Sequence, residues 1–263
     1  MSRLIDELKK VARATPQPMG FRAARPASSE PRILLIASVA RIEDTDHLAD
    51  GVDGADAVLL HLAKSHLAVN TLQKIAMSLP DMPWGGWLDE IDARKTETLV
   101  KAGCDFVVFP TASLVSATPQ DDKVGKILQV ESSLGEGLLR AINDLPVDAV
   151  LTTDTYEADG SMAWHHLMHF QRLANFLTRP LLVPVPLNVS ANEFKVLWKV
   201  GVDGIVVETD AGKPGGLREL RRVISELPPR SSRKRGKAEA LVPRVGGEGV
   251  TATEEEEEEE EDE

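Results

Sequence analysis

Five polar residues stand where apolar runs of the sequence end, so their side chains could act together on one small molecule. They are His61, Glu131, Glu208, Asn188 and Ser38. An imidazole or a carboxylate serves as a general acid or base, and an asparagine amide orients its neighbours by hydrogen bonding. Asp154, which follows the run AVLTT, is predicted to join them in a candidate catalytic site. The residue types therefore indicate acid–base chemistry.

Strand geometry gives the reason to place these residues on one surface. Side chains alternate along a strand, and the positions that helices cover must be apolar. The positions expected outside are Leu128 and Val130, Ile205 and Val207, Val58, Leu60 and Leu62, Leu181, Val183, Val185 and Leu187, and Ile33, Leu35 and Ala37. The polar residues between or after them then face inward at the carboxyl ends of the strands.

Further residues are predicted to bind a ligand at the same rim. Gln129 points inward by the same alternation, and Trp87 and Asp89 follow another strand-sized run. Crowded carboxylates favour one another's protonated form, which suits proton transfer, and their oxygens also suit Mg²⁺ or Mn²⁺. A divalent cation is therefore the candidate cofactor.

Two loops that lead into helices are candidate phosphate sites. They are NVSANE and TDAGKPGG, which supply Ser190, Lys213, Gly215 and Gly216. Backbone amides at a helix N-terminus bind phosphate, especially after the last two strands of a barrel. Against this prediction, Asp210 would repel an anion, and glycine often begins a helix without a ligand.

A short motif that recurs before apolar runs predicts the fold. Four stretches place a Gly or Pro, a small residue and an Asp before a β-branched run: GADAVLL (54–60), GCDFVVF (103–109), PVDAVLT (146–152) and GVDGIVV (201–207). Glycine ends the preceding helix, and the Asp can accept hydrogen bonds from backbone amides. Four more runs alternate with these: RILLIASV (32–39), MPWGGWL (82–88), KILQVES (126–132) and PLLVPVP (180–186).

The segments between these runs have helical periodicity, over 66–79, 92–102, 134–145, 162–177, 191–200 and 215–227. Strands that alternate with helices require right-handed crossovers and a parallel sheet. Eight such units predict an α/β fold, a (β/α)8 TIM barrel with a weak fourfold repeat. A doubly wound open sheet is the competing architecture.

Three regions are expected along the chain. Residues 1–30 contain a helix (2–14), predicted to close the N-terminal mouth of the barrel, and an extended proline-containing segment. The barrel itself spans 31–228. Residues 229–263 form a basic and then acidic tail, whose ten final carboxylates repel one another and predict disorder. The tail is either an arm that engages a basic partner or a solubilising segment.

Composition excludes several functional classes. Hydrophobic residues make up 42% of the 263 residues and aromatic residues only 4%, which favours covered parallel strands over a β-sandwich. A net charge of −12 without a basic face argues against nucleic-acid binding. The single cysteine, Cys104, cannot form an intramolecular disulfide, and no apolar run has the roughly 18 residues of a membrane span. A soluble, cytoplasmic protein is predicted.

Three other chemistries are disfavoured. His165 and His169 have the spacing of a helical metal pair, but a helical projection places them with Arg172 on the solvent side. No strand carries the interior lysine that a Schiff-base aldolase requires. Cys104 precedes a strand and lies at the N-terminal face, so it is not expected to be a nucleophile.

The chain resembles the broad class of phosphate- and flavin-binding (β/α)8 barrels in the junction KVGVDGIVVETDAGKPGG and in its regular units over residues 31–227. The resemblance implies a ligand site at the C-terminal face. Members of this class place a glycine pair at the end of strand seven and a small-residue turn after strand eight. Here these places hold PVPLNVS and ETDAG, so the resemblance does not extend to flavin.

The favoured hypothesis is an enzyme of lyase or isomerase type that acts on a small anionic or phosphorylated metabolite. The alternative is a non-catalytic barrel that serves as a ligand-binding or assembly module, with its acidic tail on a basic partner. Both a monomer and a homo-oligomer are compatible with the sequence.

Overall fold

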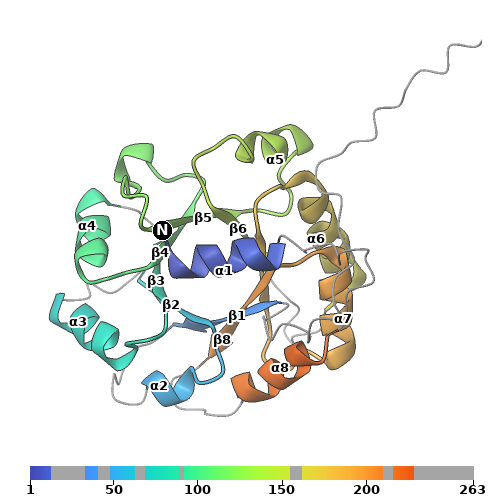
Figure 1. The fold of residues 1–263 in the computed structure, drawn as a ribbon. Coiled ribbons are helices and arrows are strands. Elements are labelled where there is room, and N and C mark those ends of the chain that lie inside the picture. The colour runs from blue at the N-terminus through green and yellow to red at the C-terminus, as the bar shows by residue number, and fades with distance from the viewer. Residues whose placement is uncertain are drawn as a thin grey trace, which may run out of the picture.

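Eight parallel strands form a closed barrel (Figure 1) in a computed structural model that describes residues 1–12, 33–40, 48–62, 69–88, 92–154, 162–209 and 216–227. The strands follow one another in chain order, and the last pairs with the first. They are β1 (Leu34–Val39), β2 (Ala57–His61), β3 (Trp84–Trp87), β4 (Phe106–Pro110), β5 (Gly125–Val130), β6 (Ala149–Thr152), β7 (Leu181–Val185) and β8 (Gly204–Thr209). The predicted barrel is confirmed, and the open-sheet alternative is wrong.

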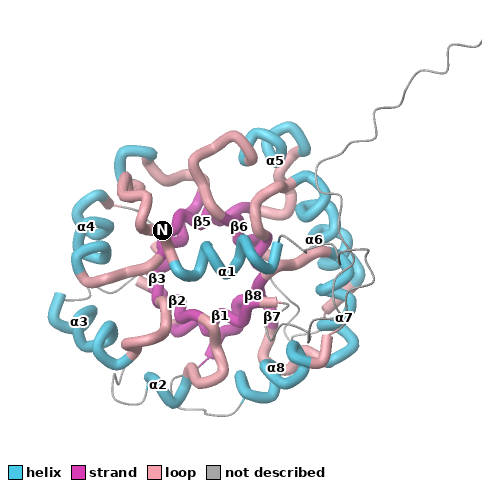
Figure 2. Tube along the Cα trace, viewed as in Figure 1, coloured by secondary structure: helices cyan, strands magenta, loops and turns pink. Residues whose placement is uncertain are grey.

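Helices surround this ring of strands, as Figure 2 shows. They are α2 (Leu48–Gly51), α3 (Val69–Ser78), α4 (Ala93–Lys101), α5 (Glu136–Ile142), α6 (Trp164–Phe176), α7 (Ala191–Val200) and α8 (Gly216–Ser225). After β4 the chain forms only a short 3-10 helix, η1 (Val115–Ala117). Its segment TASLVSATPQ lacks helical apolar spacing, and its proline forbids a longer helix.

One further helix, α1 (Arg3–Ala12), lies across the N-terminal mouth of the barrel (Figure 1). Its buried Leu4, Ile5 and Leu8 belong to the apolar cluster that fills the barrel. The carboxylate of Asp105, just before β4, accepts hydrogen bonds from Arg3 N (2.8 Å), Leu4 N (3.0 Å) and Ser2 Oγ (2.7 Å). Amides at a helix start have no partner within the helix, so Asp105 satisfies them and fixes α1. The predicted closing helix is confirmed.

The other three repeated aspartates join neighbouring strands. Each accepts a hydrogen bond from a backbone amide of the preceding strand: Leu35 N to Asp56 Oδ2 (2.8 Å), Lys126 N to Asp148 Oδ2 (3.1 Å) and Leu181 N to Asp203 Oδ2 (2.8 Å). The fourfold sequence pattern therefore corresponds to strand pairs. It departs from this rule in β3 and β4, because Asp105 binds α1 instead.

Two apolar clusters divide the core as strand alternation predicts. The inner cluster fills the barrel with residues such as Ile36, Leu59, Phe106 and Val206. The outer cluster, which includes Leu35 and the other positions expected outside except Leu187, packs the strands against the helices. Leu187 lies beyond β7 and is exposed.

The predicted tail (229–263), the extended segment after residue 12, and Asp89, Lys213 and Gly215 lie outside the described residues. No helix in the described ranges is long and apolar enough to cross a membrane.

Candidate functional site

Four predicted side chains form one connected row at the C-terminal mouth of the barrel. Ser38 Oγ and His61 Nε2 are hydrogen bonded at 2.7 Å. The rings of His61 and Trp87 lie 4.3 Å apart between centroids, inclined by 38°. Trp87 Nε1 donates a hydrogen bond to Gln129 Oε1 at 3.1 Å. This mouth row (Ser38, His61, Trp87 and Gln129) runs from β1 to β5.

Register and residue size explain why the row forms. His61 ends β2 and stands in register with Trp87, which ends β3. Below Trp87, Gly85 stands in register with Phe106, and a Cβ there would lie 2.5 Å from the carbonyl oxygen of Phe106. Because Gly85 has no side chain, the Phe106 ring can fill the interior of the barrel. The mouth row therefore packs on the apolar inner cluster.

Ser38, His61 and Glu208, on the adjacent strands β1, β2 and β8, differ in how far solvent reaches them. Ser38 is only 2% exposed, His61 is partly buried, and Glu208 is exposed. Glu208 stands in register with Ser38 and shares its inward parity, on a strand about 4.8 Å away. Ser38 is therefore suited to orient the imidazole, whereas His61 and Glu208 are the groups that a ligand can reach.

A second polar group lies at the end of β6. Thr152 Oγ1 donates a hydrogen bond to Asp154 Oδ2 at 3.0 Å, and His169 Nδ1 lies 3.6 Å from Asp154 Oδ1. The side chain of Asp154 is 8% exposed and that of His169 is 41% exposed. The buried carboxylate of Asp154 thus lies between a hydroxyl group of β6 and a partly exposed imidazole of α6. Sequence reasoning identifies Asp154 but misses Thr152 and His169.

Two residues on the predicted solvent side of α6 are only partly exposed, because they also contact the rim of the barrel. His169 contacts Asp154, and Arg172 donates hydrogen bonds to the carbonyl oxygens of Ser132 (2.8 Å) and Leu134 (2.5 Å) in the loop after β5. A helical projection finds the most apolar face of a helix. It does not reveal that rim loops cover part of the polar face. His165 is exposed, as expected.

Two predicted carboxylates do not come together. Glu131 follows β5, is exposed, and accepts a hydrogen bond from Ser133 Oγ at 3.2 Å. Strands β6 and β7 separate β5 from β8, so Glu131 and Glu208 stand on different sides of the mouth. Asn188 is exposed in the turn after β7, three strands from His61. Alternation predicts the surface that a side chain faces, but not its position around the barrel.

Ser190 and Gly216, the described residues among those predicted to bind phosphate, have structural roles of their own. At the start of α7, Ser190 Oγ donates to Glu193 Oε2 (2.6 Å), which also accepts from Ser190 N (2.7 Å). A carboxylate thus already occupies the N-terminus of α7, where an anion would bind. Gly216 begins α8, and a Cβ there would lie 2.9 Å from Leu187, so close packing explains this glycine.

Two further observations limit the chemistry. Within the described ranges, no three His, Cys, Asp or Glu side chains are grouped to hold a metal ion. Burial raises the pKa of the Cys104 thiol from 9.0 to about 12, despite hydrogen bonds to the backbone of Gly86 and Phe106. A protonated thiol at the N-terminal face is a poor nucleophile.

The fold and its mouth row define a (β/α)8 barrel whose C-terminal face carries the polar side chains, the arrangement of small-molecule enzymes of this fold. No family model and no curated protein matches the chain.

Solved structures do resemble it. Thiamine phosphate pyrophosphorylase from Pyrococcus furiosus is 12% identical, covers 74% of this chain and 96% of its own, and has a TM-score of 0.56. Tryptophan synthase from Mycobacterium tuberculosis is 12% identical, with 85% and 97% covered and a TM-score of 0.56. HpcH/HpaI aldolase from Desulfitobacterium hafniense is 11% identical, with 76% and 95% covered and a TM-score of 0.53. At these identities the likeness shows the fold alone.

Proposed function

We propose that the chain is an enzyme of lyase or isomerase type in which His61 exchanges a proton with a small ligand at the C-terminal mouth. The observation that supports this most is the 2.7 Å hydrogen bond between Ser38 Oγ and His61 Nε2. Together with the Trp87 ring, this bond fixes the plane of an imidazole that faces the mouth. An oriented imidazole that a ligand can reach is the commonest general acid–base group of enzymes.

The proposed step needs a group that accepts a proton and later returns it. His61 takes a proton from a carbon beside a carbonyl group, and the C–H electron pair moves into the carbon–carbon bond of an enolate. In an isomerisation, the protonated imidazole of His61 then gives this proton to the neighbouring carbon or oxygen. In a lyase, it protonates the departing group. Ser38 acts as a positioning residue, and Trp87 with Gln129 forms a wall.

A phosphorylated or otherwise anionic ligand is proposed from the fold. Two similar structures, thiamine phosphate pyrophosphorylase and 3-hexulose-6-phosphate synthase, have phosphate esters in their names. The second is 15% identical and has a TM-score of 0.51. The N-terminus of α8 follows β8, the place where many barrels bind phosphate. This is an argument from analogy of fold, so it proposes a ligand class and no particular substrate.

The test begins with a panel of small phosphorylated and carboxylated metabolites in D₂O, followed by NMR. We expect one member to exchange a carbon-bound proton for deuterium, or to be converted, in the presence of the protein. His61→Gln should slow this reaction about 100-fold or more, the usual contribution of a general base. Ser38→Ala should slow it less and change its pH profile, because it loosens the ring without removing it.

The matched control is His165→Gln, which changes an exposed histidine of α6 and should leave the rate unchanged. Equal rates in the wild type, His61→Gln and Glu208→Gln would show that the mouth row is not the reacting site. A ligand that binds the mouth without exchange or conversion would support the non-catalytic alternative.

A further inference from the structure

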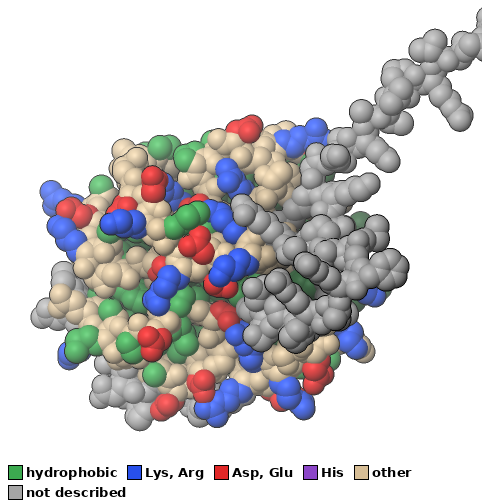
Figure 3. Space-filling view, viewed as in Figure 1, with side chains coloured by type: hydrophobic (Ala, Val, Ile, Leu, Met, Phe, Trp, Pro, Cys, Tyr) green, Lys and Arg blue, Asp and Glu red, His purple; other side chains and the backbone are tan. Residues whose placement is uncertain are grey.

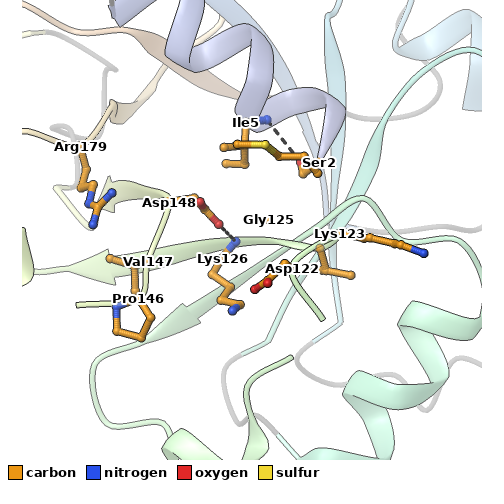
Figure 4. A pocket seen from close by; sticks show the side chains of 12 residues that line it. Ser2, Ile5, Asp122, Lys123, Gly125, Lys126, Pro146, Val147, Asp148 and Arg179 are labelled. Carbon is orange, nitrogen blue, oxygen red and sulfur yellow. Dashed lines mark hydrogen bonds between the residues drawn. The ribbon is translucent and has the colours of Figure 1, made fainter. Parts of the chain in front are cut away.

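A cavity of about 430 Å³, drawn in Figure 4, lies beside the start of α1. It is at the N-terminal end of the barrel, opposite the mouth row. The first turn of α1 forms one wall, and the beginnings of β5 and β6 with their preceding turns form the others. Ile5, Pro146 and Val147 contribute apolar surface. A volume of this size is typical of small-molecule sites.

Charged side chains dominate the rest of the lining. Lys123, Lys126 and Arg179 contribute three cations, and Asp122 and Asp148 contribute two carboxylates. In the space-filling view of this face, basic and acidic side chains lie close together (Figure 3). The charge of the lining therefore depends on which of these groups are already paired.

Asp148 is one of the paired groups. Its Oδ1 lies 3.3 Å from Lys9 Nζ of α1, and its Oδ2 accepts a hydrogen bond from the backbone amide of Lys126. The charge of Asp148 is therefore offset by a lysine that does not line the cavity. Three cations then face the single carboxylate of Asp122, which leaves the cavity with a net charge of +2.

Arg179 and Lys126 hold cationic groups that are not neutralised. Arg179 Nη2 donates to the carbonyl oxygens of Asn143 (3.0 Å) and Leu145 (3.2 Å), which orients the guanidinium without offsetting its charge. Arg179 Nε is buried and has no hydrogen-bond partner among the described residues. Lys126 is partly buried and forms no ion pair within the described part of the chain. A buried polar group without a partner is costly, so a bound acceptor would stabilise this arrangement.

We propose that this cavity binds a small anion of the phosphate-ester or pyrophosphate class. Its net positive charge attracts an anion with two or more negative charges, and its fixed guanidinium and flexible lysines are the donors that bind phosphate oxygens. The partly apolar wall strengthens these interactions by lowering the local dielectric constant. The cavity lies at the N-terminal ends of the strands, so it is separate from the proposed reacting site. It is a candidate effector site.

Isothermal titration calorimetry of the full chain with inorganic pyrophosphate, at constant ionic strength, tests this proposal. Lys126→Met keeps most of the aliphatic side chain and should weaken binding at least about tenfold, since it removes a charge-assisted hydrogen bond to the anion. Lys123→Met should also weaken it. The control Lys74→Met removes an exposed lysine of α3 and should leave the affinity unchanged.

Hydrogen–deuterium exchange locates the bound anion independently of these variants. We expect pyrophosphate to protect peptides that contain residues 122–126 and 146–148. Protection confined to peptides around His61 and Glu208 would overturn the proposal and assign the anion to the mouth. Absence of measurable heat at millimolar pyrophosphate, or equal affinity in Lys126→Met and the wild type, would also overturn it.

Discussion

Gly85→Ala adds one methyl group at the most crowded point beneath the mouth row. The new Cβ would lie 2.5 Å from the carbonyl oxygen of Phe106 and would also overlap the Phe106 ring. That ring is fully buried at the centre of the barrel. Two ring atoms of Phe106 would lie nearest, at 2.4 Å, but the backbone oxygen lies almost as close, so rotation of the ring alone cannot relieve the clash. The two strands must move apart or the core must repack.

The expected loss of unfolding free energy follows from this geometry. Overpacking a tight core costs about 1–3 kcal/mol, and more where the backbone must shift. We therefore expect Gly85→Ala to destabilise the barrel by about 3 kcal/mol or more. The matched control is Gly137→Ala in α5, where a Cβ would meet nothing within 4 Å. The same methyl group should there stabilise the protein by about 0.5–1 kcal/mol, because alanine favours the helix.

Urea unfolding, followed by circular dichroism, measures both changes. The transition midpoint should fall for Gly85→Ala and rise slightly for Gly137→Ala, without a large change in the slope m. A midpoint for Gly85→Ala within error of the wild type would refute the reasoning, because it would mean that β3 and β4 are not packed as described.

Two other predictions concern buried groups. Asp203 is fully buried and binds Leu181 N, so Asp203→Ala should lower the unfolding free energy by about 2–3 kcal/mol, whereas Asp144→Ala, at an exposed position, should change it little. Equal urea midpoints for these variants would contradict this. Cys104, with a pKa of about 12 in the folded state, should react with iodoacetamide at pH 8 far more slowly in the native than in the unfolded protein. The unfolded chain releases this proton near pH 9.0, so stability should fall above that pH by up to about 1.4 kcal/mol per pH unit; a flat profile there would count against the raised pKa.

Much of the barrel is predictable from sequence because its rules are local. Residue alternation, helix periodicity and the Asp-bearing turns each depend on a few neighbouring residues, and all indicate the same eight units. The sequence patterns do not predict α2 or the 3-10 helix after β4. Both elements are too short to show helical periodicity. Asp105 also departs from its three counterparts through a contact with α1 about a hundred residues away.

The candidate site is only partly predictable for a related reason. Ser38, His61 and Trp87 come together because adjacent strands bring them into register. Residues on non-adjacent strands, such as Glu131 and Glu208, require the position around the barrel as well as the parity. The contact between Asp154 and His169 depends on how α6 packs at the rim, which local patterns do not encode.

The long-range contacts of α1 restrict when this helix can dock during folding. Its anchors lie far along the chain, since Ser2 and Asp105 are 103 positions apart and Lys9 and Asp148 are 139 apart. This helix is synthesised before its partners, so it can dock only after the middle of the chain has been synthesised. Until then its apolar side, with Leu4, Ile5 and Leu8, cannot be buried against the barrel. A helix that precedes the whole barrel in the sequence is thus among the late elements to dock.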